Sequence, residues 1–253
     1  MLRTTCRVLA CQVLLVLASA GVATGQSPCN CEPPPEPSHL EIKWVRDSAE
    51  YAALVRQVYR QATAAVRAAA ERRGPARDWA VVLDIDETAL DNSVYQLERA
   101  AYAKPFDDAS WNAFVRRMQS PAVPGALDFV TGVRAAGGRV TWISNRDDAT
   151  REATRRNLAH VGLWHDDDRL CLLTEKAYTK AVRRREVTTG TGACAWAGRP
   201  AEVVAFVGDQ LGDFPAAGED LPDAGRDEAL GTRFFLLPDP MYGSWTTRVT
   251  REP

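Results

Sequence analysis

The chain is short of histidine and cysteine, with three and six of these residues among 253. No histidine lies at ligand spacing from a cysteine, which argues against a zinc site built from the two residue types. Basic residues are scattered, no basic tail is present and the formal charge is −2, which argues against nucleic acid polymers as partners. The apolar and charged fractions, 45% and 25%, are those of an ordinary soluble globular protein, and the length suits one core with a small cap.

A long apolar run is also lacking near the N-terminus. Two arginines precede a short apolar segment, residues 13–18, and small residues follow at 23–25. This order is typical of a secretory signal peptide, here residues 1–25, and the apolar part is too short for a membrane span. Cys11 precedes the apolar segment rather than following it, so the sequence favours cleavage over a lipid anchor. We therefore expect an exported protein, periplasmic or secreted, with outer-membrane association as the alternative.

Cleavage of the signal would leave four cysteines, Cys29, Cys31, Cys171 and Cys194. An even number in an exported chain permits disulfides. Cys29 and Cys31 are too close for an easy mutual bridge, which leaves a link from either one to Cys171 or Cys194 open. Unpaired thiols are the alternative.

Residues 26–38 are rich in proline and predict an extended linker, so that residues 39–253 form a single domain. Asp47 and Glu50 resemble a capping box and predict the start of a long helix, which Gly74 would end. This helix carries an apolar stripe at steps of three and four residues, which predicts packing on the core: Ala52, Val55, Tyr59, Ala62, Val66 and Ala69.

Short apolar runs alternate with helical segments along the rest of the chain. Buried strands are predicted at 79–83, 139–143, 170–173, 202–207 and 233–237, and helices at 110–119, 125–136 and 148–160. The alternation predicts an α/β fold in which a parallel sheet of Rossmann type is sandwiched between helices. In such sheets the ligand lies beyond the carboxyl ends of the strands.

Polar side chains gather at those ends. They follow the first, second and fourth predicted strands or open a basic helical segment: Asp84 and Asp86, Ser144-Asn145-Arg146, Asp209 and Asp213, and Lys180. Because the carboxyl ends of parallel strands meet at one edge, we expect these groups to surround one small volume. Carboxylates this close repel one another and lose hydration, so a cation should lie among them.

The residue types indicate phosphoryl transfer assisted by a metal ion. Asp84 and Asp209 offer the hard oxygen ligands that Mg²⁺ prefers. A carboxylate beside such an ion is able to attack phosphorus and form an aspartyl-phosphate, while Asp86 protonates the leaving oxygen. Ser144 and Lys180 would hold the phosphoryl oxygens.

The motifs that contain these residues resemble those of a known family. DIDET with LDNS, SNR, the lysine of KAVRR, and GDQLGDF look like the four motifs of the haloacid dehalogenase (HAD) superfamily. More narrowly, they are similar to the class C acid phosphatases of subfamily IIIB, bacterial lipoprotein-type enzymes that include 5′-nucleotidases. The similarity runs from Trp44 to Trp245 and includes KPFDDASWNAFV and LPDPMYGSW.

The resemblance implies a HAD-like Rossmannoid sheet with a small cap over about 92–123 and a helical N-terminal extension. It also implies a secreted, Mg²⁺-dependent acid phosphatase that is fastest at mildly acidic pH. The implied substrates are phosphate monoesters, above all nucleoside 5′-monophosphates, hydrolysed through an aspartyl-phosphate. A phosphotransferase on the same site, or a non-catalytic surface or storage protein that keeps the fold for binding, are the alternatives.

The same resemblance assigns roles to individual residues. Asp84 is implied to be the nucleophile and a metal ligand, and Asp209 completes the metal ligands. Asp86 is implied to be the acid and base and to bind the metal through its backbone carbonyl. Trp111 and Tyr242 match the aromatic residues that clasp a nucleotide base.

Other assignments leave alternatives open. Asn145 and Arg146 are candidates for substrate contact, although a surface ion pair would also account for Arg146. Ordinary core packing is the alternative to base stacking for Trp111. The third motif is looser than usual in the family, so Lys176 competes with Lys180 for the phosphate.

The remaining acidic residues and histidines carry weaker signals. Asp213 is suited to anchor Lys180, with helix capping as the alternative, whereas Glu87 and Asp91 are predicted to be structural. His165, beside three aspartates, is predicted to lie in an exposed loop. The lack of any histidine motif argues against the histidine-phosphate mechanism of other acid phosphatases.

Overall fold

The computed structural model describes residues 39–74, 78–196, 198–216, 219 and 226–247. The predicted signal peptide and proline-rich linker lie outside the described residues, as do Cys29 and Cys31. Within the described part, no helix is long and apolar enough to cross a membrane.

Within the described residues, five parallel strands form one sheet in the order β3-β2-β1-β4-β5. Their bounds are Trp79–Leu83 (β1), Arg139–Asp147 (β2), Arg169–Leu173 (β3), Glu202–Gly208 (β4) and Phe234–Leu236 (β5). All five predicted strands are present, so the predicted α/β fold with a parallel sheet is confirmed. Every residue of the central β1 is buried, because helices cover both faces and leave the strand no polar side.

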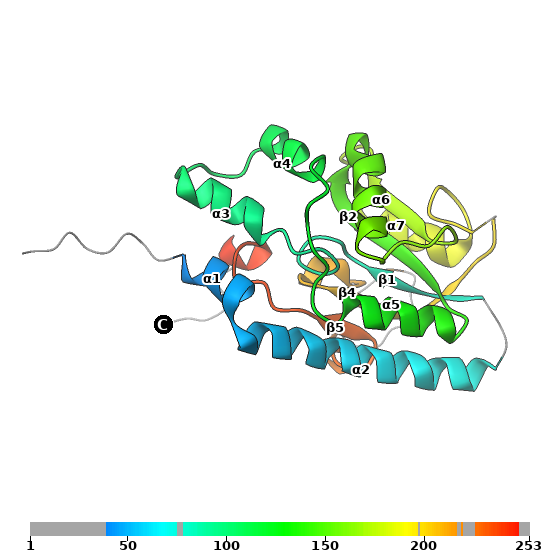
Figure 1. Cartoon of the computed structure of the whole chain (residues 1–253). Coiled ribbons are helices and arrows are strands. Elements are labelled where there is room, and N and C mark those ends of the chain that lie inside the picture. Colours follow the sequence, from blue (N-terminus) through cyan, green and yellow to red (C-terminus); the bar gives the residue numbers. More distant parts are fainter. Residues whose placement is uncertain (1–38, 75–77, 197, 217–218, 220–225, 248–253) are drawn as a thin grey trace, which may run out of the picture. The chain divides into compact units, whose positions relative to one another are not determined.

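Helices cover both faces of the sheet (Figure 1). Residues of α2 (Ala49–Arg73), α5 (Ala126–Ala135) and α6 (Arg151–His160) belong to the apolar cluster on one face, where Figure 1 shows α2 and α5 side by side. Residues of α7 (Lys180–Thr189) and the short α8 (Arg226–Ala229) belong to the cluster on the other face. Alternate residues of β1 enter the two clusters, so the central strand joins both halves of the core.

Between β1 and α5 the chain leaves the sheet. It forms α3 (Ser93–Ala101) and α4 (Asp108–Val115), which stand away from the sheet in Figure 1. Both helices lie within residues 92–123, the segment that the resemblance implies to be a cap. The sequence analysis did not predict α3, a helix of nine residues that buries only Ser93 and Tyr95.

The predicted start of the long helix is wrong. The chain forms α1 (Leu40–Asp47), turns at Ser48 and continues as α2, so Asp47 ends one helix rather than opening the next. Ser48 caps α2 because its Oγ accepts a hydrogen bond of 3.0 Å from the backbone N–H of Tyr51. The predicted end is confirmed, since Gly74 follows α2 with a φ of 65°, a conformation that glycine adopts without strain.

Cys171 and Cys194 form a disulfide, so the possible links of either residue to Cys29 or Cys31 are wrong. The bond joins β3 to the loop after α7, 23 residues further along the chain. A closed loop of this size restricts the unfolded chain, which stabilises the folded protein relative to it.

Replacing both Cys171 and Cys194 by serine is expected to lower the free energy of unfolding by about 3 kcal/mol, the usual effect of removing a disulfide that closes such a loop. Urea unfolding of the oxidised wild type and the double variant measures the difference. Reduced wild type serves as the control and should unfold at the variant's urea concentration. An unchanged midpoint in the double variant would show that the bond contributes nothing to stability.

Candidate active site

The carboxyl ends of β1, β2 and β4 meet at one edge of the sheet, where a cavity of about 620 Å³ opens. Eight of the predicted site residues line this cavity: Asp84, Asp86, Trp111, Ser144, Asn145, Arg146, Lys180 and Tyr242. The other two, Asp209 and Asp213, are buried and approach Asp84 directly. The structure thus brings all ten residues together at the edge where the sequence predicts a ligand.

Three aspartates and one lysine form a charged cluster beside the cavity. One carboxylate oxygen each of Asp84, Asp209 and Asp213 lies within 4.8 Å of the others. Lys180, the first residue of α7, places its Nζ 2.8 Å from Asp84 Oδ1 and 2.5 Å from Asp213 Oδ1. The helix starts at this point because the Thr179 side chain caps it. The cap thereby fixes the position from which the Lys180 side chain extends.

Burial shifts the pKa values of the charged groups in this cluster. Burial raises the pKa of Asp84 to about 7, and the charges of Asp213 and Asp86 act in the same direction while Lys180 opposes them. Burial also raises the pKa of Asp209 well above its usual value, with the neighbouring aspartates adding to the effect. Burial lowers the pKa of Lys180, but Asp84 and Asp213 outweigh it, so the pKa is raised and the ammonium stays charged.

The cluster suits a divalent cation. A bound cation would favour the ionised form of all three aspartates, and together with one ammonium they would then carry two negative charges, the number that a divalent ion neutralises. Asp209 Oδ2 is buried and accepts no hydrogen bond from the described residues, while Thr88 donates to Oδ1 at 3.4 Å. A buried carboxylate oxygen without a donor is costly unless a cation contacts it, and hard cations prefer such oxygens.

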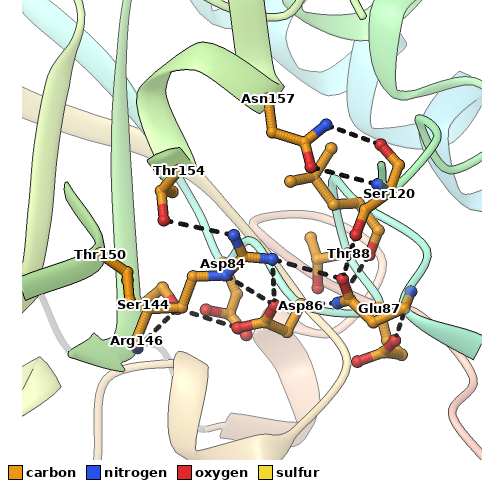
Figure 2. A network of polar contacts seen from close by, with 12 residues as sticks. Asp84, Asp86, Glu87, Thr88, Ser120, Ser144, Arg146, Thr150, Thr154 and Asn157 are labelled. Carbon is orange, nitrogen blue, oxygen red and sulfur yellow. Dashed lines mark hydrogen bonds and ion pairs between the residues drawn. The ribbon is translucent and has the colours of Figure 1, made fainter. Parts of the chain in front are cut away.

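Asp86 is held by donors from the end of β2. Ser144 Oγ donates to Asp86 Oδ2 at 3.1 Å, and the Arg146 guanidinium donates to Oδ1 from Nε at 2.9 Å and from Nη2 at 2.8 Å. Figure 2 shows Ser144 and Arg146 turned toward this carboxylate. Arg146 is only 2% exposed and pairs with Asp86, which lines the cavity, so the alternative of a surface ion pair is wrong.

Glu87 lies beneath the cavity rather than in its lining. It is 1% exposed and has a φ of 54°, in the left-handed region that side chains other than glycine rarely adopt. Its carboxylate accepts hydrogen bonds from the Asn92 backbone N–H and from the Tyr242 hydroxyl. These contacts agree with a structural role, since Glu87 joins the first motif to the segment that carries Tyr242.

Residues of α3 and α4 form the outer wall of the cavity. Several of the lining residues were not predicted from the sequence. Asp108, Trp111 and Asn112 follow the i, i+3, i+4 spacing and line the cavity from one face of α4. Trp111 also packs against the Tyr95 ring at 5.0 Å, so it serves both the core and the cavity. Gln96, Phe106 and Gln210 line the cavity as well. The spacing on α4 was visible in the sequence, but only the fold shows which face it turns inward.

The two competing lysines occupy different places. Lys180 lies within the charged cluster, whereas Lys176 is exposed and lines the rim of the cavity. Asn145 is also exposed at the rim, and its Oδ1 accepts a hydrogen bond of 2.6 Å from Arg183 Nη2. Of the two lysines, only Lys180 is adjacent to Asp84.

A parallel α/β sheet with an Asp-x-Asp loop, a serine, a lysine and a second aspartate loop at its carboxyl edge is the arrangement typical of the HAD superfamily. The comparison of sequences agrees. The acid phosphatases of HAD superfamily subfamily IIIB match residues 9–245, and the chain belongs to this family.

The chain is also similar to solved structures and to curated proteins. The class C acid phosphatase from Bacillus anthracis superposes with a TM-score of 0.67 at 28% identity, over 81% of this chain and 85% of that one. The same enzyme with tungstate bound gives 0.67 at 27% identity over the same shares of the two chains. Acid phosphatase 1 of Solanum lycopersicum is 26% identical over 166 residues, and the stem 31 kDa glycoprotein of Glycine max is 23% identical over 167. These matches cover 64% of this chain but only 57% and 58% of the two plant proteins.

Proposed function

We propose that the protein is an exported, Mg²⁺-dependent acid phosphatase that hydrolyses phosphate monoesters through an aspartyl-phosphate on Asp84. The observation that carries the proposal is the position of Asp84, beside Lys180 and within the cluster of three aspartates, where its carboxylate faces the cavity. Membership of the acid phosphatase family supports the same reaction.

In the first step Asp84 attacks the phosphorus atom, and a new P–O bond forms as the bond to the leaving oxygen breaks. Lys180 and Ser144 hold the phosphoryl oxygens, where negative charge must be neutralised. The carboxylic acid form of Asp86 gives its proton to the leaving oxygen, which departs as an alcohol. Asp86 lines the same cavity as Asp84, two residues further along, so both groups reach one substrate.

In the second step water replaces the alcohol. Asp86, now a carboxylate, takes a proton from the water as the water oxygen attacks phosphorus. The P–O bond to Asp84 breaks, which restores its carboxylate and releases inorganic phosphate. Arg146 and Ser144 hold the Asp86 side chain through both proton transfers.

Asp84 and Asp209 would hold the Mg²⁺ ion, with the backbone carbonyl of Asp86 as a further ligand. When bound, the ion supplies positive charge that offsets the negative charge of the phosphoryl group and of the aspartates. Asp213 contributes indirectly, because its carboxylate contacts Lys180 and keeps the ammonium near Asp84.

We propose nucleoside 5′-monophosphates as the preferred substrates. Trp111 and Tyr242 line it together, and each offers a rigid apolar face on which a base can stack. The Tyr242 hydroxyl is held by Glu87, which limits the rotation of this ring. The cavity volume of about 620 Å³ is in the range of small-molecule sites.

Release of inorganic phosphate from nucleotides and aryl phosphates tests the proposal. We expect release that requires Mg²⁺, stops with a chelator, and is faster at mildly acidic than at alkaline pH. Nucleoside 5′-monophosphates should rank first among the substrates. Added alcohols separate hydrolysis from phosphotransfer, since a transferase would form new phosphate esters. No release from wild type under any condition would favour a non-catalytic binding protein.

A further inference from the structure

Arg183 is a fully buried arginine one turn after Lys180 on α7, and the reaction proposed above gives it no role. The sequence shows it only as part of a basic helical segment. No carboxylate among the described residues forms an ion pair with it within 4 Å. A buried guanidinium without such a partner is costly, so its hydrogen bonds must be favourable enough to hold it there.

Those hydrogen bonds reach both the second motif and β3. Arg183 Nη1 donates to the backbone carbonyls of Ser144 at 2.5 Å and of Cys171 at 3.1 Å. Its Nη2 donates to the Asn145 side chain at 2.6 Å, and its Nε donates to the carbonyl of Thr179 at 3.2 Å. One side chain therefore joins the start of the lysine helix to residues 144–146, the irregular end of β2, which we call the bulged loop.

The backbone explains why this loop needs an outside donor. Ile143 of β2 pairs with Cys171 of β3, but the next pair is Asp147 with Leu173, so β2 has two more residues than β3 over this interval. The sheet ladder is broken across 144–146, the second motif itself, and a break of this kind redirects side chains. Arg183 bonds the Ser144 carbonyl where the regular pairing of β2 with β3 stops.

We propose that Arg183 is a positioning residue, which holds the bulged loop 144–146 against α7 and thereby sets Ser144 and Asp86 relative to Lys180. The loop is linked to the reacting groups because Ser144 Oγ donates to Asp86 and accepts from the Arg146 backbone N–H, both at 3.1 Å. The kinetic part of this inference rests on the proposed phosphatase function, whereas the structural part does not.

Arg183→Lys is the test variant, because lysine keeps the charge but lacks the planar guanidinium that reaches four acceptors. We expect kcat to fall by about 10²-fold, the effect of a displacement of reacting groups by about 1 Å. The Mg²⁺ concentration for half-maximal rate should not change, since the aspartates follow β1 and β4 rather than lying on the loop. Arg67→Lys on the exposed face of α2 is the matched control and should leave kcat unaltered.

Amide hydrogen exchange supplies a readout that does not need activity. In Arg183→Lys the amides of 144–147 should exchange faster, because the loop loses its anchor, while those of β1 should not. Equal exchange in the variant and wild type would overturn the proposal, and so would a kcat within twofold of wild type. A parallel rise in the Mg²⁺ requirement would instead indicate general damage to the site and would also contradict it. If wild type releases no phosphate, the proposed function fails, and the exchange of 144–147 still decides whether Arg183 holds the loop.

Discussion

Replacing Asp84 by asparagine should lower kcat for phosphate release by at least about 10³-fold. Asparagine has nearly the same size and still occupies the end of β1, but its amide does not attack phosphorus and form an acyl-phosphate. The fold should survive, because the change removes one negative charge from a cluster in which Asp209 and Asp213 repel it. Steady-state phosphate release and thermal unfolding of the same preparation measure the two effects.

Asp166→Asn is the matched control for Asp84→Asn. Asp166 lies in an exposed loop between α6 and β3, and the same chemical change there should alter neither rate nor stability. Full activity in Asp84→Asn, or an equal loss in the control, would remove Asp84 from the proposed mechanism. The stability measurement separates these results from simple unfolding.

Replacing Lys180 by methionine should produce the second large effect, on stability as well as rate. The ammonium lies between Asp84 and Asp213, so its loss leaves three buried carboxylates without their nearest cation. Removing one member of a buried ion pair costs about 3–5 kcal/mol, and we expect this loss in metal-free protein. Added Mg²⁺ should restore part of it, because the ion brings charge back to the cluster.

The rate of Lys180→Met should fall by about 10²-fold or more, because the phosphoryl oxygens lose a fixed positive charge. Lys176→Met, at the exposed rim of the same cavity, is the control that decides between the two lysines. It should keep the stability of wild type and most of its rate. A larger loss in Lys176→Met than in Lys180→Met would reverse the assignment. Urea unfolding with and without Mg²⁺ provides the stability comparison.

The strands were predictable because their physical cause is local. Runs such as 79–83 and 203–207 consist of apolar residues, which favours strands covered on both faces, and the structure places β1 and β4 there. The site followed from the same pattern, since the carboxyl ends of parallel strands share an edge. For this reason Asp84 and Asp209 were expected to be neighbours, although they lie 125 positions apart in the sequence (209 − 84).

Features that depend on contacts between distant segments were not predictable. The burial of Arg146 depends on the closing of α6 and the first motif around its guanidinium, which donates to Thr154 and Asp86. The disulfide requires that Cys171 and Cys194 lie with their Cα atoms 5.8 Å apart, which no spacing in the sequence reveals. Arg183 is a similar case, because its proposed role depends on the broken pairing of β2 with β3.

The predicted start of α2 was wrong for a different reason. Asp47 and Ser48 are both good N-cap residues, and Glu50 favoured the first of them by sequence alone. The structure selects Ser48, because α1 extends to Asp47, where Lys43 donates to the Asp47 carboxylate at 2.8 Å. When two candidate N-cap residues are adjacent, tertiary contacts decide at which of them the helix begins.

The central claim is that Asp84 carries the phosphoryl group between the two steps. Acid quenching of wild-type protein during turnover of a nucleoside 5′-monophosphate, followed by digestion and mass spectrometry, tests it most directly. The account predicts a phosphoryl group on the peptide that contains Asp84, labile at alkaline pH and absent from Asp84→Asn. A phosphoryl group on another residue, or none during measured turnover, would contradict it.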